Sequence, residues 1–249
     1  MTIRTLIVDI ETKPTKGFFW ALFDQNIGLN QIDTPGGIIC WAAHWDGSDE
    51  VEFSSIHMTS YKNMIGEIWK LLDEADEVVG WNSDSFDLKL LNAAFAVLGL
   101  GPPSPYKKID LMKETKKNMK FLSNKLDYVA GMFGVGHKVQ HAGFSLWLDC
   151  MKGDDKAWSI MREYNEEDVL ITARMLAVLR PWLSTNINRS AYYNAVVCPN
   201  CGGSHLQSRG FYHILFNKYR RFRCMDCGKW TRANKAEPKE RIVQQRGIR

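Results

Sequence analysis

The stretch that most constrains this chain runs from Thr5 to Thr12, where an apolar run leads into two acids, Asp9 and Glu11. A β-strand places residues i and i+2 on the same face, so both acids are expected to point the same way at the strand's end. Neighbouring carboxylates raise each other's pKa unless a cation lies between them, and Mg²⁺ or Mn²⁺ suits such a pair. The alternative is an ordinary strand whose last residues reach solvent. The metal-binding interpretation is favoured if acids from elsewhere in the chain lie close to the same point.

A second acidic stretch lies at residues 78–87. Its pattern predicts a short buried strand ending at Trp81, a polar turn, and a helix that begins near Ser85. Asp87 is then in the first helical turn, just beyond the end of a strand, where open α/β sheets build their sites. The alternative is a first-turn acid that the helix dipole favours.

A third stretch lies within a long helix that is predicted from about residue 154 to Pro181. Tyr164 and Asp168 are four residues apart, so they are neighbours on one helix face. Such a pair is ordinary by itself. It becomes informative because it follows two other acidic stretches in the same chain.

The remaining pattern of the first 188 residues alternates strands and helices, which predicts an α/β domain. Strands are expected at residues 36–45, 50–56 (an edge strand after the Asp46-Gly47 turn) and 107–111. Helices are expected at residues 60–75, 122–133 and 145–151. Between the first two strands stands an aromatic cluster, Phe18, Phe19, Trp20 and Phe23. This cluster would either stack against unpaired bases or pack over the sheet.

Charge is distributed unevenly along the 249 residues. Residues 189–249 carry 13 Lys and Arg against 3 Asp and Glu, a formal charge of +10, whereas residues 1–188 sum to −6. An acidic body with a basic appendage indicates a catalytic module joined to one that attracts polyanions. The chain has no apolar run long enough to span a membrane and no signal-peptide pattern, so a cytoplasmic protein without membrane association is expected.

Cysteine spacing predicts a second, smaller domain. Two Cys-x-x-Cys pairs are separated by 22 residues: Cys198 with Cys201, and Cys224 with Cys227. This spacing is typical of a tetrahedral site for one structural Zn²⁺ rather than of a disulfide framework. Cys40 and Cys150 lie in apolar surroundings and are expected to be core thiols.

The segment between the two cysteine pairs is rich in aromatic and basic residues and is expected to form a hairpin. Arg220, Arg221 and Arg223 are the candidate nucleic-acid contacts, because arginines alternating with aromatics suit phosphate binding and base stacking. The alternative is a purely structural ribbon. The segment resembles the N-terminal zinc ribbons of some transposases, where a Tyr/Arg-rich strand leads into the second cysteine pair.

Together the three acidic stretches resemble the motifs of the DEDD superfamily of 3′→5′ exonucleases. In chain order the motifs are Asp9-x-Glu11, Asn82-x-x-x-Phe86-Asp87 and Tyr164-x-x-x-Asp168. The tyrosine is typical of the DEDDy branch; the histidine branch would have His at position 163, which here is Glu163. The second motif and the spacer around residues 122–138 are similar to those of family-B DNA polymerase proofreading domains. The resemblance covers about residues 4–180.

This resemblance implies an RNase H-like fold, with a mixed five-stranded sheet flanked by helices. It also implies phosphodiester hydrolysis with two Mg²⁺ or Mn²⁺ ions. Asp9 would bridge the ions, and Glu11, Asp87 and Asp168 would complete their shells. Tyr164 would orient the attacking water. Asn82 and Phe86 would contact the terminal nucleotide.

The expected organisation is therefore a nuclease domain at residues 1–188, a zinc ribbon at 189–232 and a disordered polar tail at 233–249. The favoured activity is that of a free-standing 3′→5′ exonuclease acting on single-stranded DNA or DNA 3′ ends, with replication or repair proteins as candidate partners. One alternative keeps the site but changes the substrate to RNA, or the reaction to structure-specific endonucleolytic cutting. The other is an inactive nucleic-acid-binding protein, against which the presence of all four acids and the tyrosine argues.

Overall fold

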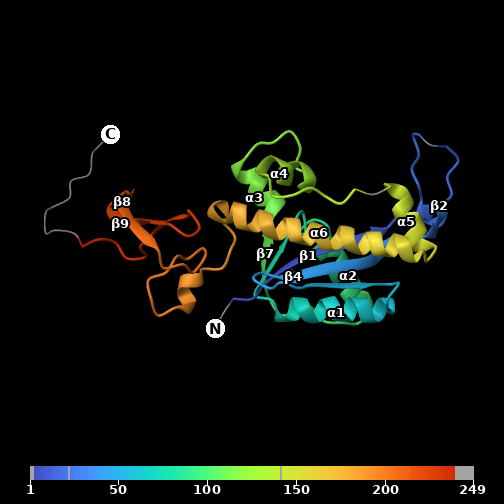
Figure 1. Cartoon of the computed structure of the whole chain (residues 1–249), viewed down its shortest axis with the longest axis horizontal. Helices are drawn as coiled ribbons and strands as arrows, with labels where there is room; N and C mark the ends of the chain where they lie inside the picture. Colours follow the sequence, from blue (N-terminus) through green and yellow to red (C-terminus); the bar gives the residue numbers. More distant parts are fainter. Residues whose placement is uncertain (1–2, 22, 141, 239–249) are drawn as a thin grey trace. The chain divides into compact units, whose positions relative to one another are not determined.

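The computed structural model describes residues 3–21, 23–140 and 142–238, and the chain forms two compact units (Figure 1). The first unit comprises Met1–Leu179 and Leu183–Asn186. The second comprises Arg180–Trp182 and Ile187–Arg249.

A mixed five-stranded sheet forms the centre of the first unit, in the order β5-β4-β1-β6-β7. Its strands are β1 (Thr5–Lys13), β4 (Gly37–Trp45), β5 (Val51–Ser55), β6 (Glu77–Gly80) and β7 (Lys107–Asp110). β4 runs antiparallel to both β1 and β5, whereas β6 is parallel to β1 and to β7. The predicted α/β fold with a mixed five-stranded sheet is confirmed.

Helices cover both faces of this sheet, as Figure 1 shows. They are α1 (Tyr61–Glu74), α2 (Asp87–Val97), α3 (Leu111–Asn118), α4 (Leu126–Phe133), α5 (Phe144–Met151) and α6 (Asp155–Leu179). Alternation along β1 sends Leu6 and Val8 into the core shared with α1 and α2, and Ile7 into the core shared with α4 and α6. None of the described helices is long and apolar enough to cross a bilayer.

The structure differs from the expected elements in the Lys-rich region after β7, where α3 was not predicted. Asp110 begins this helix, and its side chain accepts a hydrogen bond from the Lys113 backbone N–H. Lys116 and Lys117 lie in the last turn, where positive charges interact favourably with the helix dipole. The capping residue and the lysines could be read from the sequence. The apolar pattern between them was too short to indicate a helix.

A small hairpin, β2 (Lys16–Gly17) with β3 (Ile32–Thr34), projects between β1 and β4, with the short helix η1 (Leu29–Gln31) before its second strand. The aromatic cluster lies in the loop of this hairpin. Phe18 is 71%, Phe19 51%, Trp20 96% and Phe23 81% exposed. Packing of the cluster over the sheet is therefore wrong, because the rings extend into solvent.

A three-stranded antiparallel sheet forms the second unit, in the order β10-β9-β8. The unit contains η2 (Arg180–Trp182), η3 (Arg189–Tyr192), β8 (Leu206–Ile214), β9 (Asn217–Cys224) and β10 (Trp230–Arg232). The predicted tail begins at residue 233, yet Ala233 and Glu237 donate backbone hydrogen bonds to the carbonyls of Arg220 and Lys218 on β9. Residues 233 and 237 are therefore hydrogen-bonded to β9, although residues 233–238 form no strand. Residues 239–249 of that tail lie outside the described residues.

Candidate active site

Asp9 and Glu11 lie on the same face of β1, with Ala42 and Cys40 of β4 as their cross-strand neighbours. The ladder shifts register directly after Glu11, a bulge of the kind that is common beside active sites. The carboxylate oxygens of Asp9, Glu11 and Asp168 lie within 4.8 Å of one another. Two acids predicted from the first stretch and one from the third therefore meet at one point.

Helix α6 supplies three side chains to this point from little more than one turn. Tyr164 is 8% exposed and Asp168 is 1% exposed. Between them in sequence, Asn165 is fully buried, and its Nδ2 donates a 2.7 Å hydrogen bond to Oδ2 of Asp9. Asn165 therefore fixes the orientation of the first acid of the cluster.

Asp87 is the first residue of α2 and is 4% exposed. Its Oδ1 accepts a 3.1 Å hydrogen bond from the backbone N–H of Ile10, which lies between Asp9 and Glu11 on β1. Asp87 is outside the group of three carboxylates whose oxygens lie within 4.8 Å. Its negative charge nevertheless raises the pKa of Asp9, so it belongs to the same electrostatic environment.

Burial is the main cause of the perturbed acidities in the cluster. Burial and the charges of Asp87, Glu11 and Asp168 hold the pKa of Asp9 well above its usual range. Burial raises the pKa of Glu11 to about 7 and that of Asp87 to about 6, and it also raises the pKa of Asp168. Four acids with raised pKa values at one site are an arrangement that bound cations would stabilise in the ionised form.

The donor set fits a divalent metal ion of the hard, oxygen-seeking kind. Oδ1 of Asp168 is buried and has no hydrogen-bond partner among the described residues. A buried carboxylate oxygen without a donor is costly, and a metal ion would remove that cost. Asp9, Glu11 and Asp168 are close enough together to hold an ion, and the predicted participation of Asp87 stays a prediction.

Two further side chains contact the cluster, and the sequence assigned neither of them a role. The ammonium group of Lys138 contacts Asp168 and lies 2.9 Å from the Tyr164 hydroxyl. Burial lowers the pKa of Lys138, but Asp168 and Tyr164 outweigh it, so the net shift is upward. Trp147 of α5 packs edge-on against Tyr164 and hydrogen-bonds to Glu11.

Tyr164 remains a phenol at neutral pH. Burial, and then the charge of Asp168, raise its pKa to about 12. Its hydroxyl can donate or accept a hydrogen bond beside the carboxylates. With its pKa raised, the hydroxyl stays protonated at neutral pH and is a poor proton acceptor there.

A cavity of about 580 Å³ opens beside Asp9. Its walls are Trp81, Asn82, Met112, Asn124, Lys125, Leu126, Asp127 and Lys138. Asn82 has a left-handed backbone with φ of 66°, which Asn tolerates better than most residues, and its N–H donates to Asp110. Phe86 is 44% exposed and does not line this cavity in the described structure, so only Asn82 of the two predicted nucleotide contacts lies there.

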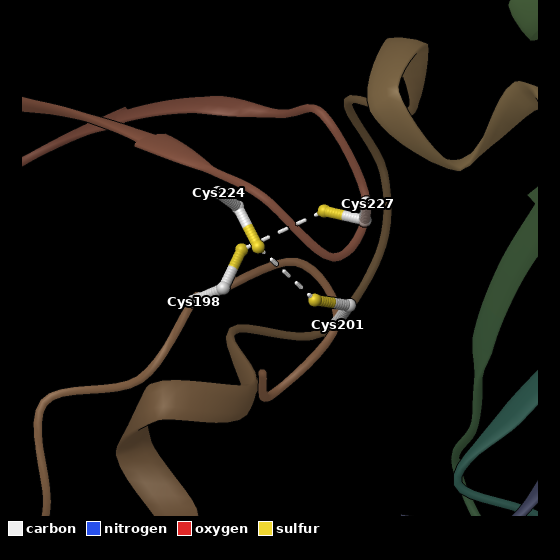
Figure 2. Close-up of side chains that lie close together, drawn as sticks. All are labelled: Cys198, Cys201, Cys224 and Cys227. Atoms are coloured by element: carbon white, nitrogen blue, oxygen red, sulfur yellow. Dashed lines mark hydrogen bonds between the residues drawn. The ribbon is translucent and has the colours of Figure 1, made fainter. Parts of the chain in front are cut away.

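Four cysteines converge in the second unit, as Figure 2 shows. The Sγ atoms of Cys198 and Cys227 are 3.8 Å apart, and those of Cys201 and Cys224 are 3.6 Å apart. Four sulfurs at about 2.3 Å from a tetrahedral zinc ion would be separated by about 3.8 Å. The predicted cysteine cluster is present with spacings that fit zinc. Cys40 and Cys150 are buried in the first unit, as expected.

The three predicted arginines of β9 lie on two faces of the strand. Arg221 and Arg223 are exposed on one face of the strand, whereas Arg220 lies on the other. Arg220 pairs with Glu237 at 3.2 Å. Neighbouring residues of a strand point to opposite faces, so Arg220 cannot share one surface with Arg221 and Arg223, and the role of all three in nucleic-acid binding stays a prediction.

A family model of the RNase H superfamily matches residues 28–180, more than half of the chain. The chain belongs to the RNase H superfamily. Among solved structures, 142 chains match. One is the family B DNA polymerase from the hyperthermophilic archaeon Pyrobaculum calidifontis, with a TM-score of 0.56 and 17% sequence identity.

This RNase H-like chain matches that polymerase over 88% of its own length but only 32% of the polymerase. At this identity the likeness establishes the fold. A search of curated proteins gives no match. Superfamily membership and the acid cluster together support a nuclease that uses divalent metal ions.

Proposed function

We propose that this protein is a divalent-metal-dependent 3′→5′ exonuclease that hydrolyses phosphodiester bonds of DNA. The observation that carries the proposal is the meeting of Asp9, Glu11 and Asp168 within 4.8 Å, beside Asp87 and a buried, unpaired oxygen of Asp168. Motif order and the tyrosine of the third motif favour the 3′→5′ direction. Likeness to a DNA polymerase favours DNA over RNA.

The acids, Asn165 and Tyr164 are proposed to have three different roles in this reaction. Asp9, Glu11, Asp87 and Asp168 would hold two Mg²⁺ or Mn²⁺ ions, which would activate the attacking water and stabilise the charge on the departing 3′ oxygen. Asn165 holds Asp9 in one orientation through its 2.7 Å hydrogen bond. Tyr164 orients the attacking water through its hydroxyl.

The cavity beside Asp9 is the proposed site of the 3′-terminal nucleotide. Trp81, Met112 and Leu126 supply apolar surface for a base, and Asn82 supplies hydrogen-bonding groups. Lys138 lines this cavity and also contacts Asp168, and its ammonium group is proposed to contact the scissile phosphate. The exposed aromatic cluster, Phe18, Phe19, Trp20 and Phe23, is proposed to stack with bases farther along the strand.

The second unit is proposed to be a zinc ribbon with one structural Zn²⁺ that increases the affinity for DNA. Its basic charge and its exposed arginines support that role. Replication or repair proteins are the proposed class of protein partner.

Cleavage of end-labelled single strands tests this function. Linear and circular forms of the same DNA, and the linear RNA, should be incubated with Mg²⁺ or Mn²⁺. A 3′→5′ exonuclease releases mononucleotides first from an unblocked 3′ end and leaves the circle intact. Asp9→Ala should remove all cleavage, and the exposed Asp49 offers a matched control in Asp49→Ala.

The outcomes separate the alternatives. Cutting of the circle would indicate an endonuclease, and faster degradation of RNA would indicate an RNA exonuclease with the same site. Absence of cleavage by a well-folded, zinc-loaded protein would favour an inactive nucleic-acid-binding protein. Near wild-type turnover by Asp9→Ala would rule out the metal-binding role of the cluster.

A further inference from the structure

The two faces of the sheet β8-β9-β10 differ in chemistry, and one of them combines arginines with aromatic rings. Directly paired residues of an antiparallel ladder share a face. Three such pairs share one face: Arg221 with Arg232, Arg223 with Trp230, and Tyr212 with Tyr219. These six side chains are named the arginine–aromatic face.

Cation–π contacts hold the arginine–aromatic face together. The guanidinium of Arg232 lies 4.2 Å from the ring centroid of Tyr219 and 5.7 Å from that of Tyr212. Arg221 lies 4.9 Å from the centroid of Trp230. Both outer rings remain about half exposed, at 48% for Tyr212 and 49% for Trp230. The face therefore presents positive charge and accessible aromatic surface together.

The positive charge of this face is not balanced from within the described part of the second unit. Arg221 and Arg232 are direct cross-strand neighbours, and like charges in that position are destabilising. The acids described in this unit are engaged elsewhere, Asp226 with His205 at 2.6 Å and Glu237 with Arg220 at 3.2 Å. An anionic ligand would remove the repulsion.

The opposite face has a different character. Phe211 lies there beneath Lys218 and Arg220, at 4.9 Å and 4.6 Å from its ring centroid. Arg220 is only partly exposed and is neutralised by Glu237. This face therefore supplies a control surface with similar residue types and a carboxylate in place.

We infer that the arginine–aromatic face binds single-stranded nucleic acid, with arginines on the phosphates and unpaired bases against the half-exposed rings. Backbone phosphates are the ligands that clustered arginines take, and base–aromatic stacking is available only to bases that are not stacked in a duplex. This inference rests on the proposed nuclease function, because it identifies how the second unit would hold the same substrate.

Binding measurements with two charge-matched double variants test the inference. Fluorescence anisotropy of labelled oligothymidylate should be followed with the full-length, zinc-loaded protein, without added Mg²⁺ or Mn²⁺. Arg221→Gln/Arg232→Gln should weaken binding about tenfold or more. It should also reduce the magnitude of the negative slope of log K for association against log salt by about 1.4. Lys218→Gln/Arg220→Gln removes the same net charge from the opposite face and should weaken binding much less.

A second arm tests stacking. Trp230→Ala should weaken binding of the single strand by about fivefold or more without changing the salt slope, since no charge is lost. Unlabelled duplex of the same length should compete poorly. Zinc content and thiol accessibility of every variant confirm that the cysteine cluster is intact.

Equal weakening by the two double variants would overturn the inference, because general charge rather than this face would then bind the strand. No change with either would overturn it as well. Equal competition by duplex would overturn the assignment to unpaired bases. Failure of the proposed nuclease is a separate result, since it would be seen as normal binding without cleavage in Mg²⁺ or Mn²⁺.

Discussion

Three neighbouring residues of α6 meet three different demands of the acid cluster. Asp168 supplies an unpaired buried oxygen, Asn165 orients Asp9, and Tyr164 places a protonated hydroxyl beside Lys138. Helical spacing brings residues three and four positions apart to one face, which is why a single turn can supply all three. Tyr164 is not one of the proposed metal ligands, so its contribution to cleavage can be measured separately from metal binding.

Tyr164→Phe should lower the single-turnover cleavage rate by about 10–10³-fold, because the variant loses the hydroxyl that orients water but keeps the ring. The metal concentration for half-maximal activity should change little, since the four carboxylates remain. Tyr192→Phe, in the second unit, is the matched control and should cleave at the normal rate. An unchanged rate in Tyr164→Phe would show that this tyrosine serves only in packing.

The raised acidities of the cluster predict how stability depends on pH without metal. Glu11 has a pKa of about 7 and Asp87 of about 6 in the folded protein, against about 4 in an unfolded chain. Between these values the folded state binds more protons than the unfolded state, so stability falls as pH rises from about 4 to about 7. Below this window both groups are protonated, and their contribution favours the folded state.

Thermal unfolding of metal-free protein across this pH range is the measurement. Glu11→Gln should flatten the fall in melting temperature, because the variant cannot ionise at that position. Added Mn²⁺ should raise the melting temperature most near pH 7 and above, where the carboxylates ionise to bind it. The same pH dependence in Glu11→Gln and wild type would contradict the assigned burial of this carboxyl.

Local spacing made part of the site visible in the sequence. Asp9 and Glu11 are two residues apart on a strand, and Tyr164 and Asp168 are four apart on a helix, so each pair could be placed without tertiary information. The hydrogen bond from Asn165 to Asp9 joins residues 156 positions apart, and no local pattern reports it. Applying strand alternation to β9 would have separated Arg220 from Arg221.

Secondary structure elements were predictable where an apolar period was long. β4 and α1 match their expected ranges closely, because each has a continuous buried stripe. α3 was missed because three of its eight residues are buried and its lysines dominate the pattern. The β2–β3 hairpin was missed because its strands have only two and three residues.

The loop of this hairpin offers a test of the aromatic cluster. Trp20→Ser with Phe23→Ser should raise the KM for single-stranded DNA several-fold, because base stacking is lost. Stability should change by less than about 0.5 kcal/mol, since both rings are exposed and pack against little. Phe133→Ser, a substitution in a partly buried ring of the core, is the contrast that should lower stability. An unchanged KM would remove the cluster from the substrate path.

Acidic and basic residues are concentrated in different parts of these 249 residues. Residues 1–188 carry a formal charge of −6 and include all four acids of the cluster, whereas residues 189–249 carry +10. A polyanion is repelled by the first part and attracted by the second. Metal ions at the cluster would reduce the local repulsion, but the long-range attraction must come from the basic part.

Removal of residues 187–249 should therefore raise the KM for DNA and flatten its salt dependence, because fewer counterions are released on binding. The turnover number at saturating substrate should change little, since no candidate catalytic side chain lies beyond Asp168 and uniform binding acts on KM. Cleavage against DNA concentration at two ionic strengths, for full-length and shortened protein, is the measurement. The Arg221→Gln/Arg232→Gln variant should reproduce part of the shift with the ribbon still present. If KM and salt slope are equal in full-length and shortened protein, the ribbon does not hold this substrate, and a protein-binding role becomes the better account of its charge.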